Sequence, residues 1–430
     1  MTASDDPLRV CHFCSLLCEL PDSNDATNFG ATFCSRREHA WRAVADSLKT
    51  GALASDASAS AMATAREGLR TATDVLVTGR IQCLATARAV IRFARAMSAT
   101  LDLWDSGPAM DLVLAIQRQG MHSVSLADAR ARTDLWIAIG TDRWLDRMPR
   151  LPGAMSRGQS VPMLLLGEWS SAAVAMWTQH GFDAISIPCP LQKIPGALAQ
   201  AIRYSRSHEP ISRVSKLLTD AKYTTVTWSG ECLNASTERG SCGDLWIEAM
   251  LRWIAARNEE VRAGLLAWGS LEGTFQQACT WLTGFPGRVR FRHGNAEYRP
   301  HEFTAVRWLS RVDRQPARGD RNEGVRGRPW IVWVDDTCEP LPEAIASSSV
   351  ARLVISPIRP TRTGSAVSEA VGHWLPCQAS GIDAADAMFR GDQAVVVHGC
   401  NPMPRDVSGP LASRSELPSV AQWLARCQTP

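Results

Sequence analysis

The sequence predicts an α/β protein with two parallel-sheet domains and a small cysteine-containing region at its N-terminus. Short, continuous apolar runs alternate with helical segments along most of the chain, which is typical of parallel sheets covered by helices on both faces. The chain has 430 residues, of which 45% are hydrophobic and 21% are charged, enough for two or three domains. In addition, four cysteines lie within the first 34 residues.

The N-terminal region is defined by Cys11, Cys14, Cys18 and Cys34, in the pattern C-x2-C-x3-C-x15-C. Three thiolates at this spacing can surround one metal centre, and the fourth can close it from the next loop. Four thiolates suit an iron–sulfur cluster or a structural zinc. The alternative interpretation is a set of ordinary buried thiols. The spacing therefore predicts a metal-binding ancestry, and whether a metal is still bound stays open.

Helices and strands follow in alternation. Apolar residues recur at three- and four-residue spacing from about Glu38 to Leu69, which predicts a long helix. A buried strand is predicted at 73–79, a helix at 85–99 and another strand in the following TLDLWD. Later apolar runs predict strands at 134–142, 161–169, 182–188, 223–230, 288–294, 329–336, 351–357, 373–378 and 393–399. This alternation predicts that both domains are Rossmann-like.

The composition shifts at residues 311–330 toward arginine and glycine, with Arg314, Arg318 and Arg321 near its middle. Such a segment is typical of an exposed linker, here between two α/β regions. The alternative interpretation is a site that holds or steers an anion.

Two segments, 293–300 and 381–393, are denser in polar and aromatic residues than their neighbours. We expect both to be loops near the carboxyl ends of strands, where α/β proteins bind ligands. The sixteen tryptophans, against three tyrosines, favour buried contacts with other subunits as well as core packing.

Several functional classes find no support in the sequence. It has no G-x-x-x-x-G-K-[ST] loop, no H-E-x-x-H pair and no G-x-S-x-G elbow. It has no apolar run of about 18 residues and no secretory signal, so we expect no membrane insertion and no export. The net charge of +3 gives no indication of nucleic-acid binding. Because the later cysteines are scattered singly, we expect reduced thiols and a cytoplasmic protein.

Four separated segments carry a resemblance to a known family. They are CHFCSLLC with Cys34, LDLWDSGPAMDLVLAIQ…TDLWIAIGTD at 101–142, LTGFPGRVRFRHGNAEYRPHEF from residue 282, and GIDAADAMFRGD at 381–392. In this order they resemble the B subunit of formylmethanofuran dehydrogenase, a relative of formate dehydrogenases and other molybdopterin oxidoreductases. The resemblance spans nearly the whole chain and implies the formate dehydrogenase-like fold.

The departures from the family pattern bear on function. The family carries a Cys-His pair that ligates molybdenum or tungsten and moves a proton, and the matching positions here are Pro108 and Ala109. If the alignment with the family motif is shifted by two or three residues, Ser106 or Asp105 stands at the ligand position and offers an oxygen ligand. The family's Leu-Gly-Glu becomes Leu-Ala127-Asp128, and its Tyr-Arg-Met-Asp becomes Phe389-Arg390-Gly391-Asp392.

These losses resemble a branch of the family, the B subunits of formyltransferase/hydrolase complexes from methylotrophic bacteria. The resemblance implies partners: an amidohydrolase-like zinc subunit, a formyltransferase subunit and a third (C) subunit. It also implies a methanofuran-type carrier whose glutamate chain could meet Arg314, Arg318 and Arg321. We therefore expect a non-catalytic structural subunit with no molybdopterin. The alternatives are an active pterin dehydrogenase, and a stand-alone metal- or anion-binding protein.

The resemblance also guides the expected domain limits. The cysteine region takes residues 1–50, and the first α/β domain is discontinuous, combining 51–105 with 330–430. The second α/β domain takes 106–310, and the arginine-rich linker at 311–329 returns the chain to the first domain. Without a pterin, an iron–sulfur cluster would have no electron partner, so we expect the cysteines to hold no cluster. A structural metal is the alternative, since thiolate ligation contributes folding free energy.

Overall fold

The computed structural model of the protein separates into two compact units. The first comprises Met1–Ser106, Leu271–Phe389 and Val396–Pro430, and the second comprises Gly107–Ser270 and Arg390–Val395. No described helix combines the length and the apolar character needed to cross a bilayer. The structure describes residues 39–40, 42–44, 46–47, 55–104, 106–142, 160–179, 181–204, 212–229, 243–268, 272–314, 327–359, 372–379, 387–389, 396–398 and 417–428.

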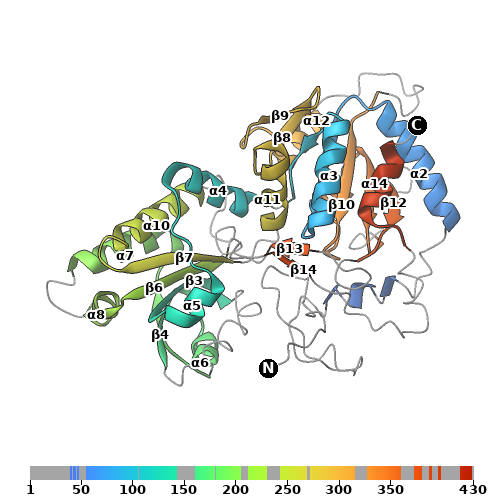
Figure 1. Cartoon of the computed structure of the whole chain (residues 1–430). Coiled ribbons are helices and arrows are strands. Elements are labelled where there is room, and N and C mark those ends of the chain that lie inside the picture. Colours follow the sequence, from blue (N-terminus) through green and yellow to red (C-terminus); the bar gives the residue numbers. More distant parts are fainter. Residues whose placement is uncertain are drawn as a thin grey trace, which may run out of the picture. The chain divides into compact units, whose positions relative to one another are not determined.

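The first unit is built on a seven-stranded sheet (Figure 1) with the order β12-β11-β10-β1-β2-β8-β9. Neighbouring strands from β12 to β2 are parallel, whereas β8 pairs antiparallel with both β2 and β9. The strands are β1 Val75–Arg80, β2 Thr100–Leu101, β8 Val289–Arg292, β9 Asn295–Tyr298, β10 Trp330–Asp335, β11 Ala351–Ser356 and β12 Gly372–Pro376.

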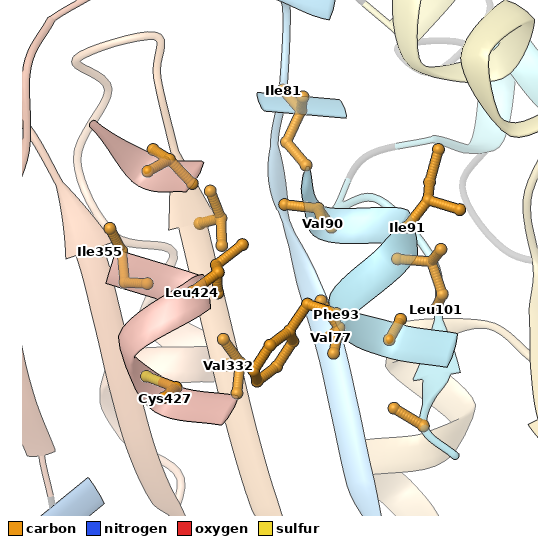
Figure 2. Close-up of a cluster of buried hydrophobic side chains, with 14 of the residues drawn as sticks. Val77, Ile81, Val90, Ile91, Phe93, Leu101, Val332, Ile355, Leu424 and Cys427 are labelled. Carbon is orange, nitrogen blue, oxygen red and sulfur yellow. The ribbon is translucent and has the colours of Figure 1, made fainter. Parts of the chain in front are cut away.

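Helices cover both faces of this sheet, which explains why its central strands are continuously apolar. Every residue of β10 is buried. On one face, buried side chains of α2, α3, α11 and α14 share a core with the strands, and Figure 2 shows Phe93 of α3 pointing toward Val332 of β10. On the other face, α12 and α13 pack against Leu76, Ile331 and Trp333. The helices are α2 Ser55–Arg70, α3 Leu84–Ala96, α11 Glu272–Thr283, α12 Ala305–Arg314, α13 Glu343–Ala346 and α14 Val420–Gln428.

The order of the strands creates a switch point between β1 and β10. From β1 the chain passes through α3 to β2 on one side, while β10 and then β11 and β12 lie on the other side. In open α/β sheets, such a reversal leaves a crevice at the carboxyl ends of the two strands, where ligands commonly bind.

The second unit contains a five-stranded sheet in the order β5-β4-β3-β6-β7, and all its neighbouring strands are parallel. The strands are β3 Leu135–Thr141, β4 Val161–Glu168, β5 Phe182–Pro188, β6 Tyr223–Ser229 and β7 Arg262–Trp268. The helices are α4 Gly107–Gln119, α5 Leu126–Arg132, α6 Ser171–Gln179, the 3-10 turn η3 Leu191–Lys193, α7 Ile194–Tyr204, α8 Ser212–Asp220 and α10 Gly243–Arg257.

The predicted fold class, two α/β domains, is confirmed. Several details differ from the prediction. The segments 293–300 and 381–393, expected as loops, contain the strands β9 and β13 (Ala387–Phe389), and β13 pairs antiparallel with β14 (Val396–His398). The long helix expected from Glu38 to Leu69 is described as α2 and as helical residues between 39 and 47.

The division of the chain also differs from the expected limits. Residues 271–310 were expected in the second domain, but they belong to the first unit because β8 pairs with β2 and α11 packs on α3. The segment 311–329 is therefore not a crossing between domains, since it connects α12 to β10 within the first unit, and its first four residues are helical.

Candidate functional site

Asp102, directly after β2, is an acidic residue at the carboxyl end of the first sheet. Its side chain is 4% exposed. Its Oδ1 accepts a hydrogen bond from Ser106 Oγ at 2.9 Å, and its Oδ2 accepts one from the Ala305 N–H at 2.8 Å. Ala305 is the first residue of α12, so the carboxylate also faces the positive end of that helix. A buried carboxylate held by these donors has a structural role as its default interpretation.

Arg288 completes this group from the residue before β8. Its Nε lies 3.6 Å from Asp102 Oδ1, and its Nη2 donates to Ser106 Oγ at 3.4 Å. The same guanidinium donates from Nη1 to the Pro300 carbonyl at 2.8 Å. Its backbone has φ +49°, a strained conformation for a residue with a side chain. Asp102, Ser106 and Arg288 therefore form a buried polar cluster, called here the β2 cluster.

In the β2 cluster, burial and hydrogen-bonding or charged partners shift the pKa of Asp102 in opposite directions. Burial raises the pKa of the Asp102 carboxyl, while Arg288, the Ala305 N–H and the Ser106 hydroxyl each lower it in part. Ser106 Oγ both donates to Asp102 and accepts from Arg288. These two hydrogen bonds use the only proton of the hydroxyl and one of its two lone pairs.

A pair of acidic residues lies at the carboxyl end of β10, beside the switch point. Asp335 ends β10 and Asp336 follows it, and both are 1% exposed. Asp335 Oδ1 accepts from the N–H and the hydroxyl of Thr337, each at 2.7 Å. Burial raises the pKa of Asp335 to about 6, although the Thr337 hydroxyl and nearby Arg80 lower it in part.

Asp336 occupies the N-terminus of α3. Its Oδ1 accepts from the Gln82 N–H at 2.8 Å and its Oδ2 from the Cys83 N–H at 3.2 Å, and Cys83 is the N-cap of α3. In nucleotide- and phosphate-binding α/β proteins, the N–H groups at such a position bind the anionic part of the ligand. Here the chain supplies the anion itself, so a cofactor phosphate does not fit at these N–H groups.

Pro108 and Ala109, at the positions of the family's metal-binding Cys and catalytic His, belong to the first turn of α4 in the second unit. Both side chains are buried. Neither carries a donor atom that can ligate a metal or move a proton. The residue types at these positions therefore do not fit a molybdenum or tungsten centre.

The remaining sequence-derived candidates have separate locations. Ala127 and Asp128 lie in the first turn of α5, where the Asp128 N–H donates to Ser125 Oγ at 3.0 Å and thereby caps the helix. Arg314 is the exposed last residue of α12. The backbone of Phe389 ends β13. The candidates outside the described residues are Cys11, Cys14, Cys18, Cys34, Asp105, Arg318, Arg321, Arg390, Gly391 and Asp392.

Sequence reasoning passed over the acidic residues that dominate this edge of the sheet. Asp335 and Asp336 end the apolar run PWIVWVDD, and two acids directly after a buried strand are a signal that could have been used. Asp102 stood within the segment quoted for the family resemblance. Its partner could not be recognised, because Arg288 lies far along the chain and reaches the cluster through antiparallel pairing.

No profile of a known protein family matches the sequence, and no curated protein matches it. Among solved structures, the chain is similar to one from the X-ray crystal structure of the formyltransferase/hydrolase complex (FhcABCD) from Methylorubrum extorquens in complex with methylofuran. The two superpose with a TM-score of 0.65 at 19% sequence identity, covering 87% of this chain and 95% of that chain. This match confirms the resemblance inferred from sequence at the level of fold: the protein has the fold of a chain of that complex.

Proposed function

We propose that this protein is a non-catalytic structural subunit of a cytoplasmic formyltransferase/hydrolase complex. In the proposed complex, a formyl group passes from formyl-tetrahydromethanopterin to the amine of a methanofuran-type carrier. Water then hydrolyses the resulting formamide and releases formate. No electrons are transferred in either step. The partners proposed are an amidohydrolase-like zinc subunit, a formyltransferase subunit and a third (C) subunit, with the carrier bearing a polyglutamyl chain.

The observation that carries this proposal is that internal contacts occupy the polar groups at the carboxyl edge of the first sheet. The β2 cluster satisfies its own charges, and Asp336 takes the α3 N-terminus that a cofactor phosphate would need. At the same time, Pro108 and Ala109 lack donor atoms. A chain that keeps the fold but fills its cofactor edge with internal contacts is best suited to holding other subunits together.

The test is co-expression with the three proposed partners, with and without this chain. We expect the complete set to co-purify and to release formate from formyl-tetrahydromethanopterin, with neither molybdenum nor tungsten bound to this chain. We also expect the partners to fail to assemble when this chain is omitted. Metal content is measured by mass spectrometry, and formate by a coupled assay.

Two results would overturn the proposal in different ways. Bound pterin with about one molybdenum or tungsten per chain would support an active dehydrogenase instead. Partners that assemble and release formate equally well without this chain would support a stand-alone protein.

A further inference from the structure

Helix α3 carries a stripe of exposed arginines on its outer side. Arg88, Arg92 and Arg95 are exposed and recur at four- and three-residue spacing, which places them on one face of the helix. The opposite face is buried in the core through residues such as Val90 and Phe93. No acidic residue occurs in α3, whose sequence is LATARAVIRFARA.

Two of these arginines are not neutralised within the part of the chain that the structure describes. Arg88 and Arg92 have no carboxylate within ion-pair distance there, whereas some exposed arginines elsewhere in the unit do. Arg70 pairs with Glu67 at 2.9 Å, and Arg311 pairs with Asp74 at 2.7 Å. Helix α14 packs beside α3 and also lacks acidic residues, with sequence VAQWLARCQ. Among the described residues, the positive charge of Arg88 and Arg92 therefore has no carboxylate that balances it at ion-pair distance.

An exposed tryptophan lies next to the arginine stripe. Trp281, in the last turn of α11, is 62% exposed, whereas the other tryptophan side chains whose burial the structure describes are buried or half-buried. Helix α11 packs against α3, and Arg95 Nη2 donates to the carbonyl of Leu282, the residue after Trp281, at 2.8 Å. Tryptophan and arginine are the residues most enriched at the energetic centres of protein interfaces.

We propose that this face, formed by Arg88, Arg92, Arg95 and Trp281 and called the α3 face, docks an acidic surface of another subunit. The inference rests on the proposed function, because it assumes the complex. Arg88 and Arg92 are about 6 Å apart along the helix axis. The partner surface then carries carboxylates at about that spacing beside an apolar patch that covers Trp281. A protein is favoured over a nucleic acid because the stripe is confined to one helix in a chain whose net charge is only +3.

The experiment uses the full chain co-expressed with the three proposed partners. The test variants are Arg88→Glu with Arg92→Glu, and Trp281→Ala. The control is Arg130→Glu with Arg307→Glu, which makes the same change in net charge at exposed positions of α5 and α12. Both test variants are expected to weaken retention of one subunit at least about tenfold, and the control is expected to leave it unchanged.

A photo-crosslinking amino acid at Ala96, exposed on the same side of α3, identifies what is bound. The expected crosslink is to an Asp/Glu-rich peptide of the subunit that the variants lose, and retention of that subunit should fall with rising salt concentration. Equal retention by test and control variants, with all subunits present, would overturn the inference and leave the proposed function standing. Retention that nuclease treatment abolishes would assign the face to nucleic acid. Failure of the wild-type chain to retain any of the three subunits would remove the proposed function itself.

Discussion

The two sheets differ in how they use acidic residues at the carboxyl ends of their strands. In the first unit, Asp102, Asp335 and Asp336 are between 1% and 4% exposed and are held by internal donors. In the second unit, Asp142 after β3 is half-buried and Glu168 at the end of β4 is exposed. Asp142 Oδ1 accepts a hydrogen bond from the Ser170 N–H at 2.9 Å.

The comparison shows that burial, rather than residue type, decides the role of these carboxylates. An acid at the carboxyl end of a parallel strand is a candidate ligand-binding group in either sheet. In the first sheet, removal from water makes each carboxylate depend on its protein partners, so these residues hold β2, β10, α3 and α12 together. In the second sheet, Asp142 and Glu168 remain in contact with water, so their charges need no protein partners to be stable.

The largest expected effect follows from removing the carboxylate of the β2 cluster. Asp102→Ala leaves the Arg288 guanidinium buried without its counter-ion, which should lower the free energy of unfolding by about 3–5 kcal/mol. Asp142→Ala, the matched change in the second sheet, should cost under about 1 kcal/mol. Urea unfolding of the full chain, followed by tryptophan fluorescence, measures both.

A double variant sharpens this first test. Adding Arg288→Met to Asp102→Ala removes the stranded charge, so the pair should cost less than the sum of the two single changes. Strict additivity, or an equal loss from Asp102→Ala and Asp142→Ala, would contradict the distinction between the two sheets.

The second prediction concerns pH. Burial raises the pKa of Asp335 to about 6, above its value in the unfolded chain, so the folded state holds a proton that the unfolded state releases. Stability should therefore fall as the pH rises from about 4 to about 6, and this contribution should stay constant at higher pH. Asp335→Asn keeps an oxygen for the two Thr337 donors and removes the charge, so it should add up to about 3 kcal/mol at pH 7.5.

Thermal unfolding at pH 4.5 and at pH 7.5 checks this prediction. The gain from Asp335→Asn should be larger at pH 7.5 than at pH 4.5. A variant that is less stable than the wild type at both values would show that the charged form is the one stabilised in the fold.

Much of the fold was predictable because each central strand forms a continuous apolar run in the sequence. The run that became β10 is apolar without interruption, and every one of its residues is buried. The antiparallel pairing of β8 with β2 was not predictable, because the direction of a strand depends on distant partners. The β2 cluster was not predictable for the same reason, since Ser106 and Arg288 are 182 residues apart in sequence. Polar clusters of this kind are therefore assembled by topology and are not visible as local motifs.

The third prediction tests whether Asp336 substitutes for a bound anion. Asp336→Ala leaves the buried N–H groups of Gln82 and Cys83 without an acceptor. It should lower the free energy of unfolding by about 2 kcal/mol. Ser170→Ala, which removes an exposed cap from α6 in the second unit, should cost about 1 kcal/mol or less. Inorganic phosphate should raise the unfolding temperature of Asp336→Ala and leave that of the wild type unchanged. Stabilisation of both proteins by phosphate would mean that Asp336 does not occupy the anion site.

The smallest effect is expected from Ser106→Ala, and it separates the structural role of this hydroxyl from metal ligation. Without the hydroxyl, Asp102 keeps Arg288 and the Ala305 N–H, so the loss should be about 1 kcal/mol. Formate release by the co-expressed complex should not change, because the hydroxyl is already used within the β2 cluster. A variant that folds normally yet loses bound molybdenum or tungsten together with activity would make Ser106 a ligand. The carboxyl edge of the first sheet would then hold a working cofactor site, and its buried acids would be arranged around that site rather than in place of it.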